Sequence, residues 1–107
     1  MNALVPSNER LRVLRDQIDA LCRRHHVRRL DLFGSTARDK AVAGSDYDFL
    51  VEFGPLPAGG YADAYFGLLE DLQSLLEAPV ELLVERAIRN PYLKRSLQDR
   101  RESVYAA

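Results

Sequence analysis

Residues 32–53, LFGSTARDKAVAGSDYDFLVEF, decide the fold and hold the chemistry of this chain. Tyr47–Phe53 is predicted to be a strand, because every second residue along it is aromatic or aliphatic. These residues form one strongly apolar face: Tyr47, Phe49, Val51 and Phe53. Asp46 and Asp48 share the opposite face, and residues two apart on a strand lie about 6–7 Å apart. Two such carboxylates repel each other unless a cation lies between them. Hard cations such as Mg²⁺ prefer oxygen ligands, so the pair predicts a metal site; the alternative is a solvated strand edge.

Gly34 and Ser35 lie between a predicted strand and the start of a predicted helix. Glycine lets the backbone approach a ligand closely, and the N–H groups of a helix start, with the Ser hydroxyl, can hold phosphate oxygens. The alternative is an ordinary turn in which Ser35 is the N-cap. Glu81 could supply a third carboxylate if its strand, Val80–Val84, lies next to the one that carries Asp48; the alternative is an exposed carboxylate on that strand. Together these residues predict metal-assisted phosphoryl transfer.

The rest of the chain predicts a small α/β (α+β) domain in which helices cover a mixed sheet. The connection between the first two strands is short, so their relative direction stays open. Hydrophobic spacing and turn residues predict, in order, a helix over about Asn8–Arg24 with Ser7 as N-cap, a strand over Val27–Phe33, a short helix over Thr36–Ala41, the strand Tyr47–Phe53, a loop over residues 54–60, a helix over about Ala62–Glu77, the strand Val80–Val84, and a last helix that begins at Asn90 and Pro91. Val104 is expected to face inward from this last helix.

Length and composition favour one domain over residues 1–107. The chain is 47% hydrophobic and 29% charged, as in ordinary soluble proteins. No apolar run approaches the roughly 20 residues that span a bilayer, and the N-terminus lacks a signal-peptide pattern. The single cysteine, Cys22, excludes an internal disulfide, and these features together favour the cytoplasm and no membrane association. Because aromatic residues do not interleave with the basic ones, direct nucleic-acid binding is disfavoured.

A longer pattern joins the two motifs. Gly34-Ser35, ten intervening residues and Asp46-x-Asp48 resemble the signature of the polymerase-β-like nucleotidyltransferase superfamily. The fuller form, GSTAR followed by SDYDFLVEF, is similar to the minimal nucleotidyltransferase (MNT) branch, which includes the MntA-type antitoxins paired with HEPN ribonuclease toxins. The resemblance runs from the first strand through VELLVERAIRNPYLKRSL (residues 80–97) to the terminal Val-Tyr, and so covers most of the chain.

The resemblance implies the polymerase-β-like nucleotidyltransferase fold and a role for each motif residue. Asp46 and Asp48 would be the metal-binding catalytic carboxylates. Gly34 and Ser35 would hold the β- and γ-phosphates of the nucleotide. Arg38, one turn into the short helix, would steady the triphosphate or the helix itself, and its alternative is a solvent-exposed helix arginine.

Glu81 falls where this family usually has Asp, so it would be a third metal-binding catalytic carboxylate. Its longer side chain would shift the geometry of the site and lower the activity of the enzyme. The implied activity is Mg²⁺-dependent transfer of AMP from ATP to a tyrosine hydroxyl of a HEPN toxin, which blocks the toxin. Since 107 residues leave no room for an acceptor-binding domain, the acceptor would come from another chain, in a homo- or hetero-oligomer. Two alternatives stay open: a small-molecule nucleotidyltransferase that needs a helper subunit, and an antitoxin that inhibits by binding alone. The intact pair of aspartates favours an enzyme, and the departure at residue 81 keeps the binding alternative open.

Overall fold

The computed structural model describes residues 9–33, 47–84, 89–92, 95 and 101–107. All three predicted strands and the helix predicted over about Ala62–Glu77 are confirmed. Each has the alternation or helical spacing of apolar residues that a buried face requires. The predicted N-cap Ser7 and the short helix at 36–41 lie outside the described residues. The elements are α1 (Glu9–Val13), α2 (Arg15–Arg24), β1 (Val27–Phe33), β2 (Tyr47–Phe53), α3 (Tyr61–Leu76), β3 (Val80–Val84) and β4 (Arg101–Ala106).

The four strands form one mixed sheet in the order β3-β2-β1-β4. β1 pairs antiparallel with both β2 and β4, whereas β2 and β3 pair in parallel. The direction of the first two strands, which the sequence left open, is therefore antiparallel. The sheet with its helices confirms the predicted α+β class, and its order places β3 directly beside β2.

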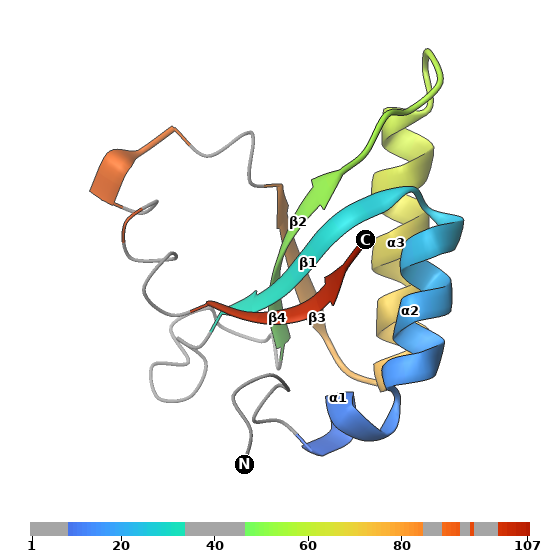
Figure 1. Cartoon of the computed structure of the whole chain (residues 1–107), viewed down its shortest axis with the longest axis vertical. Helices are drawn as coiled ribbons and strands as arrows, with labels where there is room; N and C mark the ends of the chain where they lie inside the picture. Colours follow the sequence, from blue (N-terminus) through green and yellow to red (C-terminus); the bar gives the residue numbers. More distant parts are fainter. Residues whose placement is uncertain (1–8, 34–46, 85–88, 93–94, 96–100) are drawn as a thin grey trace.

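Helices α2 and α3 pack side by side against one face of this sheet (Figure 1). Phe49 of β2 and Leu68 and Leu72 of α3 are fully buried between the layers. Burying one such side chain contributes about 1.5–3 kcal/mol, so this core holds β2 firmly in the interior of the sheet. Of the helices in the described part of the chain, none is long and apolar enough to cross a membrane.

The first predicted helix differs in the structure, where it is interrupted at Leu14 and forms α1 and α2. Leu14 has φ −95° and ψ 13°, which departs from regular helix geometry. Its N–H still donates to the Arg10 carbonyl at 3.0 Å, and the Ile18 N–H donates to the Leu14 carbonyl at 2.9 Å. The chain therefore bends without losing these hydrogen bonds, and both Leu11 and Ile18 are buried in the core.

The end of the chain corrects the sequence prediction more strongly. Asn90 caps as expected, since its side chain accepts a hydrogen bond from the Tyr92 N–H at 2.9 Å. Residues 101–106, however, form the strand β4, so Val104 is half-buried against the core from a strand and not from a helix. The segment is short and its pairing with β1 is non-local, so local propensity does not reveal it.

Candidate active site

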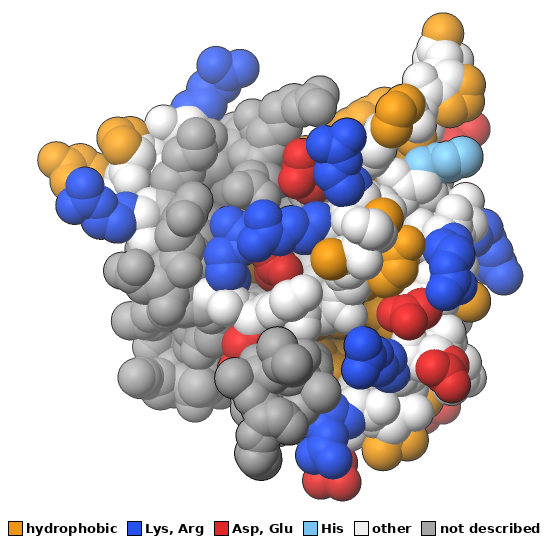
Figure 2. Space-filling model, viewed as in Figure 1, with side chains coloured by type: hydrophobic (Ala, Val, Ile, Leu, Met, Phe, Trp, Pro, Cys, Tyr) orange, Lys and Arg blue, Asp and Glu red, His pale blue; other side chains and the backbone are white. Residues whose placement is uncertain are grey.

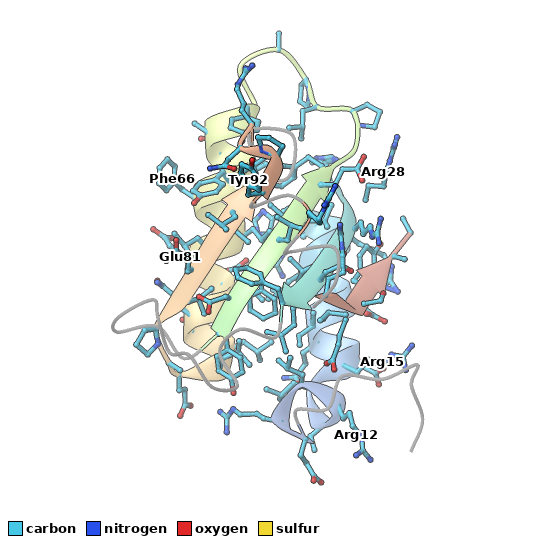
Figure 3. All side chains as sticks on the ribbon, turned by 90° about the vertical axis from the view of Figure 1, so that its left-hand side faces the viewer. Arg12, Arg15, Arg28, Phe66, Glu81 and Tyr92 are labelled. Carbon is cyan, nitrogen blue, oxygen red and sulfur yellow. The ribbon has the colours of Figure 1, made fainter. Side chains whose placement is uncertain are left out.

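The sheet face opposite α2 and α3 carries acidic side chains, and we call it the carboxylate face (Asp31, Asp48, Glu52 and Glu81). Across the parallel β2–β3 pair, Asp48 is the in-register partner of Glu81. Directly paired residues project from the same face of neighbouring strands, whose backbones lie about 5 Å apart. Figure 3 looks onto this face and shows Glu81 on β3. The condition that the sequence set for a role of Glu81, a strand next to Asp48, is met.

The two paired carboxylates differ in their environment. Asp48 is only 1% exposed, whereas Glu81, on the edge strand, is half-buried. Placing a buried carboxylate beside a second one is unfavourable unless positive charge compensates them. An all-oxygen donor pair of this kind fits a hard divalent cation such as Mg²⁺ better than a soft metal.

A small apolar cluster lies beside these carboxylates on the same face. Phe33 and Leu50 are buried there, with Leu83 packed against them. Leu50 follows Asp48 by two residues, and Leu83 follows Glu81 by two, so the cluster borders the pair along both strands. Electrostatic interactions are stronger in such surroundings than in water, which suits a site that binds cations and phosphates.

Four of the predicted site residues, Gly34, Ser35, Arg38 and Asp46, lie outside the described residues. Because β1 and β2 are antiparallel and Leu32 pairs with Phe49, the end of β1 and the start of β2 meet at one end of the sheet. The two chain ends that flank residues 34–46 are therefore close to Asp48. Within the described ranges, no group of three His, Cys, Asp or Glu side chains is placed to hold a metal ion.

Asp31 on β1 is a buried carboxylate that the sequence analysis did not single out. It is 0% exposed, and its Oδ2 accepts a hydrogen bond from Nε of Arg101 at 2.7 Å. Nη2 of Arg101 also lies 2.7 Å from this oxygen, and Nε of Arg29 lies 3.1 Å away. Oδ1 is buried without a hydrogen-bond partner among the described residues. The ion pair ties β4 to β1 beside the site. Its only signal in the sequence is an acidic residue between Leu30 and Leu32.

Comparison with known proteins identifies relatives over most of the chain. Residues 14–104 match the protein family described as "Nucleotidyltransferase domain". Two proteins of Methanocaldococcus jannaschii, each named "Putative protein adenylyltransferase", are 37% and 33% identical over 87 residues. Each of these matches covers 81% of this chain and 86% of the relative.

Solved structures show the same architecture. A structure described as a "putative minimal nucleotidyltransferase" superposes with a TM-score of 0.67 and 32% identity, over 94% of each chain. An MNT antitoxin in complex with a tri-AMPylated HEPN toxin of Shewanella oneidensis gives a TM-score of 0.61 at 19% identity, over 91% of this chain and 73% of that one. A toxin–antitoxin complex with AMP-PNP gives 0.59 at 21% identity, over 87% of this chain and 73% of that one. The last two likenesses concern the fold alone.

Proposed function

The chain belongs to the nucleotidyltransferase domain family, and from this we propose that it is a Mg²⁺-dependent protein adenylyltransferase that transfers AMP from ATP to a tyrosine hydroxyl of a HEPN ribonuclease toxin. The modified toxin is inactive, so the chain acts as its antitoxin. The observation that carries the proposal is the in-register pairing of Asp48 with Glu81 on the carboxylate face. The names of the M. jannaschii relatives support a protein acceptor, and the toxin–antitoxin complexes support a HEPN partner.

In this proposal Asp46, Asp48 and Glu81 hold the metal ion through their carboxylate oxygens. A metal held by these carboxylates would supply positive charge to offset the negative charge of the triphosphate oxygens. The core behind β2 holds Asp48 in place, so this carboxylate needs little rearrangement when ATP binds. Glu81 reaches the same place from the edge strand with a side chain one methylene longer than that of Asp.

The nucleotide is held by the residues that follow β1. The backbone N–H of Gly34 and the hydroxyl of Ser35 bind the β- and γ-phosphates, and Arg38 steadies the triphosphate. A bond then forms between the acceptor tyrosine oxygen and the α-phosphorus of ATP, while the bond from that phosphorus to the β-phosphate oxygen breaks. Pyrophosphate leaves with the electron pair, and the tyrosine proton passes to a carboxylate of the site.

The test uses the purified protein, Mg²⁺, ATP and the protein encoded by the adjacent gene. We expect the partner to gain the mass of AMP in intact-mass measurements, and label on the α-phosphate of ATP, but not on the γ-phosphate, to follow it. Asp48→Asn should lower transfer by about a hundredfold or more, because it removes a metal ligand but keeps the shape of the side chain. Glu52→Gln is the matched control, since Glu52 lies on the same strand and face but is half-exposed, with Oε2 3.7 Å from Nη1 of Arg28.

One result would refute the proposed activity, and another would refute the proposed site. A folded pair of proteins that yields no adduct with ATP and Mg²⁺ would exclude adenylyl transfer to this partner, and inhibition of the partner's ribonuclease without an adduct would instead indicate an antitoxin that acts by binding. Near-normal transfer by Asp48→Asn would show that the metal site is assigned to the wrong residues.

A further inference from the structure

A groove of about 530 Å³ lies between the N-terminal helices and the strand β4. β4 is at the opposite edge of the sheet from β3. The helices form one wall and the end of the chain forms the other. The lining residues on the helix side are Leu11, Arg12, Arg15, Asp19 and Arg23, and those on the strand side are Ser103, Val104, Tyr105, Ala106 and Ala107.

The strand side of this groove is the edge of the sheet. β4 pairs with β1 on one side, and no strand in the described part of the chain pairs with its other side. β4 begins with two charged residues, Arg101 and Glu102, whereas the part of the edge that lines the groove, residues 103–107 (SVYAA), contains neither a charged residue nor a proline. Proteins commonly use such residues to keep edge strands from pairing with other chains. Among the described residues, the edge over residues 103–107 therefore offers backbone N–H and C=O groups to an incoming strand.

The helix side of the groove is basic. Arg12, Arg15 and Arg23 are all exposed, and Asp19 is the single acidic residue of the lining. Figure 2 shows basic side chains over α2 beside the end of β4, and Figure 3 shows Arg12 and Arg15 lying toward the β4 edge of the sheet. A ligand in the groove would meet positive charge on one side and, on the other, a strand edge that no described strand covers.

We propose that this groove binds an extended acidic segment of a partner protein, which pairs with β4 as a further strand and directs its carboxylates toward the arginines. Strand addition uses the backbone of both chains, and alternate side chains of the added strand reach one wall of the groove. This interaction is separate from nucleotide transfer and does not depend on the proposed activity.

Two other occupants fit the groove less well. A second copy of the chain paired through β4 would bring two sets of three arginines together, and this repulsion disfavours a homodimer. A nucleic acid would use the arginines but would leave the alternating N–H and C=O groups of residues 103–107 without partners. An acidic strand satisfies both walls.

The probe is a C-amidated hexapeptide of sequence Glu-Thr-Glu-Val-Glu-Thr that carries fluorescein on its N-terminal amine, titrated with the full chain in the absence of nucleotide and followed by fluorescence anisotropy. We expect saturable binding, and slower hydrogen exchange of the backbone amides within residues 103–107 when the peptide is bound. A peptide of equal charge with proline in place of both threonines should bind about tenfold more weakly, because proline lacks the N–H that the strand edge requires.

The arginines are tested with the double variant Arg12→Glu/Arg15→Glu, which should weaken binding about tenfold. Arg89→Glu is the control, since it reverses a charge that is also exposed but lies outside the groove, and it should leave the affinity unchanged. Circular dichroism of both variants verifies that they are folded. Asp48→Asn should also bind the peptide normally, so that failure of the groove and failure of the active site can be told apart.

Several results would overturn the proposal. One is the absence of any anisotropy change at millimolar protein, and another is unchanged hydrogen exchange over residues 103–107. Equal binding of the proline peptide, together with tighter binding of an oligouridine of the same charge, would show that the groove attracts polyanions through its arginines alone.

Discussion

Replacing Arg101 with methionine should destabilise the fold strongly, because Arg29 is then the only cation among the described residues that pairs with the buried Asp31 carboxylate. Asp31 is 0% exposed, and both Nε and Nη2 of Arg101 lie 2.7 Å from its Oδ2. Removing one partner of a buried ion pair costs about 3–5 kcal/mol. Arg29 stays in place at 3.1 Å, with a side chain that is 45% exposed and screened by water. We therefore expect a loss near the lower limit, about 3 kcal/mol.

The loss is measured by urea unfolding followed by circular dichroism, with the slope m compared between variants. In thermal unfolding the same change should lower Tm by about 12–24 °C for a domain of this size. Arg29→Met is the matched control, because its half-exposed guanidinium should be worth only about 0.2–1 kcal/mol.

A double-mutant cycle separates the pair from its surroundings. In Asp31→Leu/Arg101→Met both charges are absent, the buried Oδ1 without a described partner is removed, and leucine at residue 31 faces its register partner Leu50. This double variant should be within about 1 kcal/mol of the original protein, as is common when a buried ion pair is replaced by apolar side chains. The reasoning is refuted if Arg101→Met costs less than about 0.5 kcal/mol, or if the two single changes add without coupling.

Three further predictions concern other parts of the chain. Glu81→Gln should slow adenylyl transfer less than Asp48→Asn, because water can replace a ligand on the half-exposed edge strand; equal loss of initial rate would contradict this. Burial, and secondarily the charge of a nearby aspartate, raises the pKa of Cys22 from 9.0 to about 12. The native thiol should therefore resist a disulfide reagent at pH 8, and the free energy of unfolding should fall as the pH rises above about 9, by up to roughly 1.4 kcal/mol per pH unit, because the unfolded thiol loses its proton first; fast labelling of the native protein would refute the burial argument. Gly67→Ala would place a Cβ 2.7 Å from Cε1 of His25, whose Nε2 lies 2.7 Å from a carboxylate of α3. We expect it to cost about 1 kcal/mol in urea unfolding, although alanine normally stabilises a helix, and to become stabilising in a His25→Ala background.

Local patterns predicted β1, β2, α3 and β3 well, because each buries one face and its apolar residues must recur with the period of a strand or a helix. The bend at Leu14 was not predictable from that spacing, since the apolar residues before and after it fit a continuous helix. β4 was missed because its six residues acquire strand structure only by pairing with β1.

The site shows the same division. Asp48 could be proposed as a metal ligand from its spacing to Asp46 and from the apolar face behind it. Whether Glu81 belongs to the same site depended on the order and register of β2 and β3, which local sequence does not encode. The partner of Asp31 lies 70 residues away, so no local pattern could have identified that ion pair.

By itself, the sequence determined that β1, β2, α3 and β3 form and which residue types are available for phosphoryl transfer, because periodicity and side-chain chemistry are properties of neighbouring residues. Only the tertiary structure decided that Asp48 faces Glu81 and that Asp31 faces Arg101. It also decided that the edge of β4 lies against a row of arginines. These arrangements arise from hydrogen bonding and burial between segments far apart in the chain, and such contacts exist only once the sheet has formed.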